Sequence, residues 1–234
     1  MILIKLTGGL GNQLFQYAHG RALSHIKKES LYLDTSWYKG RIDRTYLLGN
    51  FHINAKVANL FQKLFKTPIA GDFQNEKCFK EIESILRQEL VLKRIPDTVQ
   101  DPDSVSIHLR GNDYVRGKKS AFHGTCSPEY YKQAIDLVHS RVSKPHFYIF
   151  TDDLPWAKEH IPFPEPFTIM SGGTVEELIL MASCRHNIIA NSTFSWWAAW
   201  LNKNPEKIVI GPKVWFADEK MGTSDILPAS WIRI

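Results

Sequence analysis

The clearest chemical signal in the sequence is a histidine, an arginine and an aspartate near the end of one apolar run. They lie in Val105-Ser-Ile-His-Leu-Arg-Gly-Asn-Asp-Tyr114, as His108, Arg110 and Asp113. Alternate side chains of a strand share a face, so we expect His108 and Arg110 to point the same way, before Gly111 lets the chain turn. A guanidinium there can grip a diphosphate through paired charged hydrogen bonds. An ordinary Arg–Asp ion pair that closes a loop fits the same spacing.

A second signal is the glycine turn that follows the apolar run at 1–6. The turn Thr7-Gly-Gly-Leu-Gly11 precedes a helix that we expect from Asn12, as its cap, to about Lys28. A helix start can aim backbone amides at a ligand, and amide side chains suit sugar hydroxyls. A tight turn with a capping asparagine explains the spacing equally well. The candidate ligand-binding residues of this turn are Gly9, Gly11, Asn12 and Gln13.

The same turn superficially matches a dinucleotide-binding fingerprint, with Asp34 about where a ribose-binding acid would lie. The match fails at Leu14, which occupies the place of the third glycine, where close packing of helix on strand is normally required. An NAD-dependent oxidoreductase therefore remains an alternative that the sequence disfavours.

Two further apolar runs end in polar groups. The run from His146 leads to the adjacent carboxylates of Asp152 and Asp153, which can bind a metal, accept hydrogen bonds from a base edge, or cap the next helix. The run at 187–190 leads to a hydroxyl-rich turn at the start of an aromatic helix, a natural place for an anion. The candidate residues of this turn are Asn191, Ser192, Thr193 and Ser195.

The elements that must position these residues alternate between strands and helices. Helices are expected at about 128–142, after the Ser127-Pro128 start, and at about 175–185, after a capping box from Thr174 to Glu177. The alternation predicts βαβ units and a mainly parallel sheet, whose ligands gather at the carboxyl ends of the strands. Expected strands from 104 onward are 105–109, 146–151, 167–170, 187–190 and 207–210. The polar, proline-bearing stretch 95–103 predicts a linker between an N-terminal domain, 1–100, and a C-terminal domain, 104–234.

Charge and cysteine content narrow the classes of partner. The formal charge of +5 and the pI near 9.0 favour anionic partners, but the basic residues are too scattered to make nucleic acid the leading one. Three well-separated cysteines indicate neither a disulfide framework nor a zinc site. No apolar run approaches the roughly 20 residues that span a bilayer. We therefore expect a cytoplasmic protein, with peripheral contact at the inner face of the membrane left open.

Together these segments resemble the α-1,2-fucosyltransferases of glycosyltransferase family 11. Three blocks carry the resemblance: Gly8-Gly-Leu-Gly-Asn-Gln-Leu-Phe-Gln-Tyr-Ala18, the H-x-R segment from His108 to Asp113, and Asn191-Ser-Thr-Phe-Ser-Trp-Trp-Ala-Ala-Trp-Leu201. The resemblance implies an α/β, GT-B-like fold with two Rossmann-type domains, the C-terminal one binding GDP-fucose and the N-terminal one on the acceptor side. It also implies inverting transfer of L-fucose to the 2-hydroxyl of a terminal galactose, with no metal or other cofactor. A fucosyltransferase of another linkage and a non-catalytic glycan-binding module remain alternatives.

The resemblance also implies roles for single residues. Arg110 would hold the β-phosphate, His108 would lie against the nucleoside, and one of Asp152 and Asp153 would accept from the guanine edge. The hydroxyls of Ser192, Thr193 and Ser195 would complete the phosphate and ribose contacts. The family pattern H-x-R-R-x-D is broken at Gly111, which stands where the second arginine is usual. For the catalytic base we expect Asp113, with His123 and His19 as alternatives.

Overall fold

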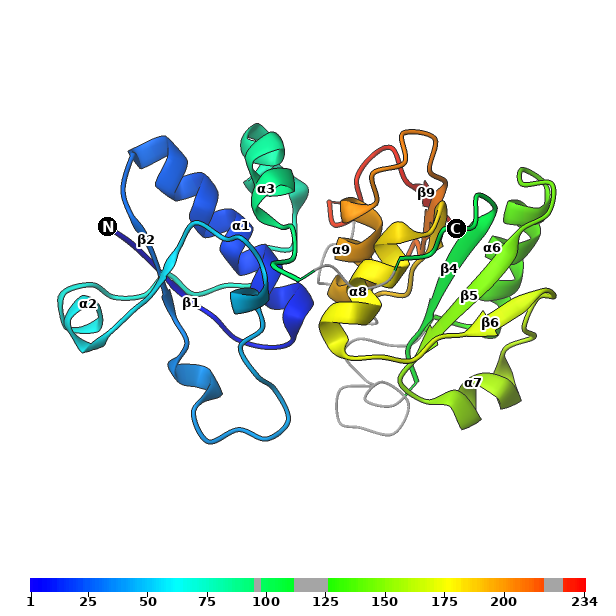
Figure 1. The fold of residues 1–234 in the computed structure, drawn as a ribbon, viewed down its shortest axis with the longest axis horizontal. Coiled ribbons are helices and arrows are strands. Elements are labelled where there is room, and N and C mark those ends of the chain that lie inside the picture. The colour runs from blue at the N-terminus through cyan, green and yellow to red at the C-terminus, as the bar shows by residue number, and fades with distance from the viewer. Residues whose placement is uncertain (95–97, 112–125, 217–224) are drawn as a thin grey trace. The chain divides into compact units, whose positions relative to one another are not determined.

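The chain divides into two compact units. The computed structural model describes residues 1–94, 98–111, 126–216 and 225–234 (Figure 1). Unit 1 is Met1–Ile95 and unit 2 is Pro96–Ile234, so the division falls at the start of the polar stretch 95–103. Each unit is described below by itself.

Unit 1 is built on a small parallel sheet. Strand β1 (Ile2–Lys5) pairs with β2 (Leu31–Asp34), and β2 pairs with the two-residue β3 (Lys56–Val57). Ile69 forms a parallel bridge with Ile4 on the opposite edge of β1. The helices of this unit are α1 (Leu10–Lys27), α2 (Leu60–Phe65) and α3 (Glu83–Glu89). Short 3₁₀ turns join them at Ser36–Tyr38, Leu48–Asn50, Glu76–Cys78 and Lys80–Ile82.

Helix α1 packs directly on β1. A side chain at Gly20 would collide with Ile4, so the closest approach of helix and strand lies at Gly20. Leu14, at the place of the missing third glycine, is instead fully buried. The helix begins at Leu10 with Gly9 as its N-cap, so the prediction that Asn12 caps it is wrong: Asn12 lies inside the first turn. Near the end of the helix, Ile26 is 61% exposed.

Unit 2 contains a six-stranded sheet in which every recorded strand pairing is parallel. The spatial order is β6-β5-β4-β7-β8-β9, so the chain builds outward from β4 in one direction and then returns to build in the other. This order equals the 3-2-1-4-5-6 arrangement of nucleotide-binding sheets, whose switch point lies between the first and fourth strands, here β4 and β7. The strands are β4 (Ser104–Leu109), β5 (His146–Thr151), β6 (Phe167–Ile169), β7 (His186–Ile188), β8 (Val209–Gly211) and β9 (Ile232–Arg233).

The helices of unit 2 alternate with these strands. They are α6 (Pro128–His139), α7 (Leu154–His160), α8 (Thr174–Ser183) and α9 (Thr193–Leu201). Ser127 caps α6 as predicted, its hydroxyl accepting from the Tyr130 amide at 3.2 Å. The predicted capping box of α8 is shifted by one residue: Gly173 is the N-cap, and its amide donates to Glu176 at 2.9 Å. The predicted α/β class with a mainly parallel sheet is confirmed.

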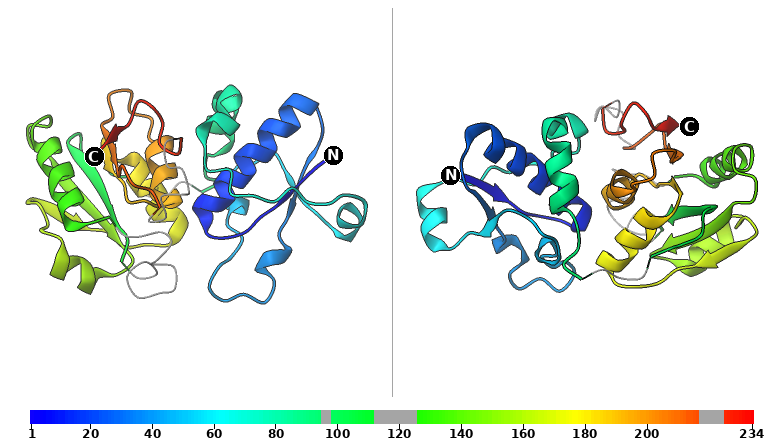
Figure 2. Two further views of the ribbon diagram at one scale, coloured as in Figure 1. Left: turned by 180° about the vertical axis from the view of Figure 1, so that it is seen from behind. Right: turned by 45° about the horizontal axis from the view of Figure 1, so that its top comes forward.

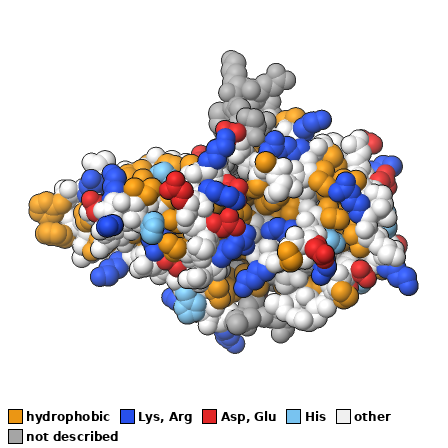
Figure 3. All heavy atoms as spheres, turned by 90° about the horizontal axis from the view of Figure 1, so that it is seen from above, with side chains coloured by type: hydrophobic (Ala, Val, Ile, Leu, Met, Phe, Trp, Pro, Cys, Tyr) orange, Lys and Arg blue, Asp and Glu red, His pale blue; other side chains and the backbone are white. Residues whose placement is uncertain are grey.

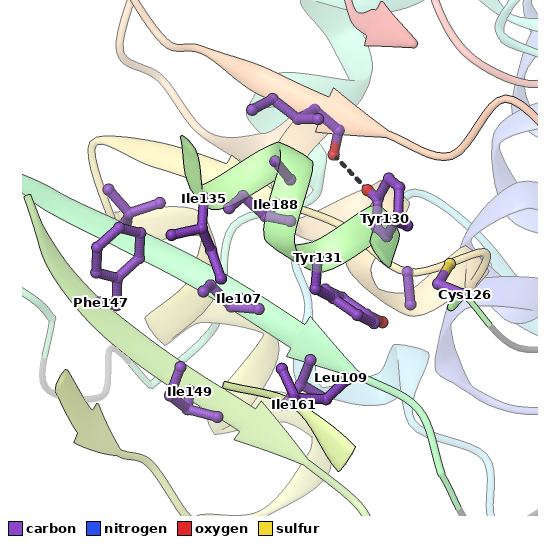
Figure 4. Packing of buried hydrophobic residues seen from close by; sticks show 14 of the residues in the cluster. Ile107, Leu109, Cys126, Tyr130, Tyr131, Ile135, Phe147, Ile149, Ile161 and Ile188 are labelled. Carbon is purple, nitrogen blue, oxygen red and sulfur yellow. Dashed lines mark hydrogen bonds between the residues drawn. The ribbon is translucent and has the colours of Figure 1, made fainter. Parts of the chain in front are cut away.

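The two faces of this sheet differ in character. On one face Ile107 and Phe147 pack against Tyr131 and Ile135 of α6 in a continuous apolar core, which α7 extends (Figure 4). Helices α8 and α9 pack on each other and cover the opposite face, as both turned views show (Figure 2). Odd-numbered residues of β4 thus enter the apolar core, while even-numbered residues face α8 and α9. Ser106 confirms the alternation, because its hydroxyl accepts from Asn187 on the α8 side at 2.7 Å.

Candidate functional site

The candidate site of unit 2 lies at the carboxyl ends of β4, β5 and β7. His108 is the last even-numbered residue of β4, and Arg110 follows two residues later. Because β4 and β5 pair in register from Ser104 with His146 to Leu109 with Thr151, continuing the register sets Arg110 beside Asp152. The start of α9 follows β7 on the other side of β4. Ligands of open α/β sheets bind at this crevice.

His108 is a buried histidine that stays neutral. Its side chain is 5% exposed, and its ring lies 5.8 Å from the ring of Phe194 in the first turn of α9. Burial, with a smaller contribution from the charge of Arg110, lowers the pKa of His108 to about 3. Among the described residues its Nδ1 has no hydrogen-bond partner. A neutral imidazole of this kind can exchange a hydrogen bond with a ligand but brings no charge.

Arg110 forms an ion pair with Asp152. Nε of Arg110 lies 3.3 Å from Oδ2 of Asp152, and the two side chains are 21% and 33% exposed. Oδ1 of the same carboxylate accepts from the Gly111 amide at 2.9 Å. Asp152 therefore fixes both the guanidinium and the turn after β4. The neighbouring Asp153 has a different task, since its carboxylate caps α7 by accepting from the Trp156 amide at 3.1 Å.

Gly111 is enclosed by α7. A Cβ at this position would lie 2.9 Å from the Trp156 ring and 3.0 Å from Cβ of Asp153, closer than such contacts occur. Any larger side chain must displace the indole or the helix cap. This packing gives a physical reason for glycine here, where the family pattern has a second arginine. The structure thus explains the departure that the sequence alone left open.

The polar side chains of the hydroxyl-rich turn before α9 are largely bonded to backbone groups of the chain. Ser192 is the N-cap of α9, its hydroxyl accepting from the Phe194 amide at 3.3 Å. The Ser195 hydroxyl, 1% exposed, donates to the carbonyl of Ser192 at 3.3 Å. The Asn191 amide group donates to the Trp215 carbonyl at 3.1 Å. These three polar side chains hold the helix start in place, while Thr193, the first helical residue, is partly exposed.

Glu177 is a further candidate that the sequence does not single out. The sequence predicts it as half of a capping box, but its Oε1 accepts from the Gly172 amide at 3.1 Å. Burial, with a contribution from nearby Asp152, raises the pKa of its carboxyl group. A shifted carboxyl beside a charged strand end is a recognised sign of a functional site. Sequence spacing gave no such signal, because α8 and β5 meet only in the fold.

The glycine turn of unit 1 is arranged differently. Gln13 is fully buried: its side chain accepts from the Leu47 amide at 2.9 Å and donates to the Thr45 carbonyl at 2.9 Å. Gln13 therefore braces the loop at 45–47 and is not placed to contact a ligand in this structure. Gly11, also predicted to contact a ligand, is buried within the first turn of α1. Gly9 and Asn12 lie partly exposed at the helix start.

The candidates for the catalytic base lie largely outside the described residues. Asp113 and His123 both belong to 112–125, which the structure does not describe. His19, the third candidate, lies on α1 and stacks on Phe73 with ring centroids 4.0 Å apart. Burial lowers the pKa of His19, so it is neutral and able to accept a proton at pH 7.

Within the described part of the chain, no cluster of three or more His, Cys, Asp or Glu side chains is suited to a metal ion. None of the helices within these ranges has the length and apolarity needed to cross a membrane.

The overall fold matches solved glycosyltransferases. A crystal structure of the NodZ α-1,6-fucosyltransferase soaked with GDP-fucose aligns with a TM-score of 0.51 over 86% of this chain and 91% of that chain, at 10% identity. At 10% identity, this structural similarity supports the fold alone. With its two α/β units, the chain has the fold of the GT-B glycosyltransferases, as the sequence predicts.

Sequence comparison then gives the family. An α-1,2-colitosyltransferase of Escherichia coli is 31% identical over 100% of this chain and 99% of its own. The galactoside 2-α-L-fucosyltransferase Sec1 of Mus musculus is 23% identical over 86% of this chain and 64% of its own. The family described as Glycosyl transferase family 11 matches residues 58–234. The chain belongs to this family and is a glycosyltransferase, which confirms the resemblance seen in the sequence.

Proposed function

We propose that this glycosyltransferase moves L-fucose from GDP-fucose to the 2-hydroxyl of a terminal galactose, with inversion at the anomeric carbon. The observation that carries the proposal is the set of residues at the β4–β7 switch point: an oriented arginine, a neutral buried histidine and a helix start. These are groups that bind a nucleoside diphosphate. The α-1,2 linkage is taken from the names of the two family relatives.

In this proposal Arg110 holds the β-phosphate of the donor. Asp152 orients the guanidinium, so that its charge is in place before the diphosphate departs. The backbone amides at the start of α9, with Thr193, add to the stabilisation of the leaving group. Nδ1 of His108 makes a hydrogen bond to the nucleoside. Contact with the guanine edge is left to one of Asp152 and Asp153: Asp152 engages both carboxylate oxygens within the chain, whereas Asp153 uses one oxygen to cap α7.

The acceptor hydroxyl needs a base on the opposite face of the fucose carbon. We assign this role to Asp113, with His123 and His19 as alternatives. Replacing Asp113 by Asn is expected to slow transfer while calorimetry still finds GDP bound. Loss of GDP binding in that variant would instead make Asp113 a structural residue.

GDP-colitose is a second candidate donor, because the E. coli relative that aligns over 99% of its own length is named for colitose. Colitose is L-fucose without its 3-hydroxyl, so a site for either sugar differs mainly in how it treats that hydroxyl. A site that hydrogen-bonds the hydroxyl strongly disfavours the deoxy sugar, while an apolar pocket at that point tolerates it. We place fucose first, from the resemblance of the sequence to fucosyltransferases.

One assay tests these assignments together. The protein is incubated with lactose and either GDP-fucose or GDP-colitose, in EDTA, and products are identified by mass spectrometry and by the linkage in NMR. We expect a 2-linked fucosyl lactose without added metal. Absence of transfer from GDP-fucose, with transfer from GDP-colitose, would replace the donor assignment. Galactoside binding without turnover of either donor would favour the non-catalytic glycan-binding module.

A further inference from the structure

Helix α2 of unit 1 turns its apolar side chains toward solvent. Leu60, Phe61, Leu64 and Phe65 are each between 62% and 72% exposed, and Val57 of β3, just before the helix, is 53% exposed. These five residues, named the α2 patch below, are most of the large apolar side chains that stand exposed in the described chain. Isolated exposed apolar residues are ordinary, whereas a contiguous group indicates an interaction surface.

One ion pair joins the helix to the end of β2, and a local capping box begins the helix. Nζ of Lys63 lies 2.5 Å from Oδ1 of Asp34, a carboxylate at the end of β2 that is 5% exposed. Asn59 and Gln62 form a capping box at the start of the helix, the Asn59 amide donating to Gln62 at 3.0 Å. At 100° per residue the apolar positions span one side of the helix and Lys63 lies on the other. The helix is amphipathic, but its apolar side is the outer one.

Lysines lie close to the patch. Lys56 and Lys66 immediately flank its residues in the sequence and both are exposed. Lys66 also acts electrostatically on the carboxylate of Glu29, as do Lys27 at the end of α1 and the N-terminal ammonium group, so three positive charges and one negative charge lie in one region. Figure 3 shows apolar side chains gathered at the end of unit 1 that carries α2, with basic side chains next to them. The surface therefore combines an apolar centre with a positively charged border.

We propose that the α2 patch docks on the surface of a bilayer that contains anionic lipid. Amphipathic helices bind in this way, with apolar side chains in the acyl boundary and lysines at the anionic headgroups. Leucine and phenylalanine enter the bilayer from α2, while Lys56 and Lys66 remain at its surface. The enzyme is then held beside glycans carried on lipid.

A second copy of the chain fits this surface less well. Six helical residues extend only about 9 Å, while a stable protein interface covers about 800 Å² on each partner. In a two-fold dimer through α2, both copies would bring the same lysine-bearing surface to the interface, which gathers like charge there. The lysine border complements an anionic surface and opposes a second copy of itself.

Vesicle co-sedimentation of the full chain tests the proposal. We expect binding to vesicles of phosphatidylcholine with phosphatidylglycerol, and little binding to phosphatidylcholine alone. The affinity of the double variant Phe61→Ser/Phe65→Ser for these vesicles should fall by at least about tenfold, because both rings leave the interface. Lys66→Glu should weaken binding by about fivefold or more, since one lysine at the surface contributes about that factor.

The matched control is Ile42→Ser, which removes a fully exposed apolar side chain of unit 1 outside the patch and should bind as the original chain does. Circular dichroism confirms that each variant is folded, and Leu60→Ser/Leu64→Ser gives an independent pair. Equal binding by the patch variants and the control would overturn the proposal. The proposal would also be overturned if light scattering showed that the original chain is a dimer and that the patch variants are monomers. The assay contains no sugar donor, so its failure leaves the proposed transfer reaction untouched.

Discussion

Two turns in this molecule begin with the same kind of signal and end with different arrangements. After β1, the amide side chain of Gln13 is fully buried and bonded to the backbone of the 45–47 loop. After β4, His108 keeps a ring nitrogen without a partner among the described residues, and Arg110 is 21% exposed and oriented by Asp152. The first turn uses its polar groups to hold its own fold. In the proposed reaction, the second presents them to the sugar donor.

The difference teaches how to interpret polar residues at strand ends. Spacing alone predicts the same ligand-binding role for Gln13 and for Arg110. What separates them is whether nearby backbone groups need partners: the loop at 45–47 presents an amide and a carbonyl that Gln13 satisfies. The four predictions below test this contrast, beginning with the largest expected effect.

Replacing Arg110 by Ala should lower the rate of sugar transfer by about 100-fold or more, because a preorganised charge facing the leaving group is lost. The matched control is Arg185→Ala, which removes an arginine of the same unit from an exposed ion pair with Glu206. Steady-state kinetics with both variants decide the matter. Near-normal transfer by the Arg110 variant would reduce that arginine to a partner of Asp152 alone.

Replacing Gln13 by Ala should destabilise unit 1 by about 2 kcal/mol, because the Leu47 amide and the Thr45 carbonyl both lose a buried partner. Urea unfolding followed by circular dichroism measures the change. The control is Gln88→Ala, at an exposed position of α3. If the Gln13 variant kept its stability but lost affinity for the sugar donor, the contrast between the two turns would be wrong.

Replacing Gly111 by Ala should destabilise unit 2 by about 1.5 kcal/mol, since the new methyl group overlaps the Trp156 ring. Gly49→Ala is a suitable comparison, because a Cβ there meets only an ordinary contact with Tyr46 at 3.4 Å. Urea unfolding of both variants tests the packing argument. An unchanged midpoint for Gly111→Ala would mean that α7 yields easily and that a second arginine is excluded for another reason.

The smallest effect concerns pH. The folded chain keeps His108 neutral down to its lowered pKa of about 3, while the unfolded chain takes up a proton below about pH 6.5. The stability linked to His108 is therefore complete above pH 6.5 and falls on acidification, by up to about 1.4 kcal/mol per pH unit. Between pH 6.5 and 5.5, the free energy of unfolding measured with urea should fall more in the original chain than in His108→Gln. Parallel losses would show that His108 titrates normally.

Much of unit 2 was predictable because its elements carry strong local signals. The strand at 146–151 agrees with the structure to the residue, and the Ser127-Pro128 start of α6 was identified correctly. The common direction of His108 and Arg110 follows from strand alternation alone. Such features depend on short stretches of sequence, whose periods and caps are visible without the fold.

The remaining features depend on contacts between distant segments. Glu177 becomes a candidate only because α8 packs on β5, and Gly111 is explained by Trp156 and Asp153, 45 and 42 positions later in the chain. In unit 1, the exposed apolar side of α2 contradicts the usual expectation that apolar residues face inward. On the opposite side of the helix, Lys63 pairs with the buried Asp34. A pattern of residue types records amphipathicity, but not which side faces the core.

The aromatic content of α9 has a practical consequence. Of the seven tryptophans, Trp37 alone belongs to unit 1, and Trp196, Trp197 and Trp200 lie buried in α9. Intrinsic fluorescence therefore reports almost entirely on unit 2, whereas circular dichroism follows both units. The two signals, recorded on one sample, resolve the melting of each half without any label.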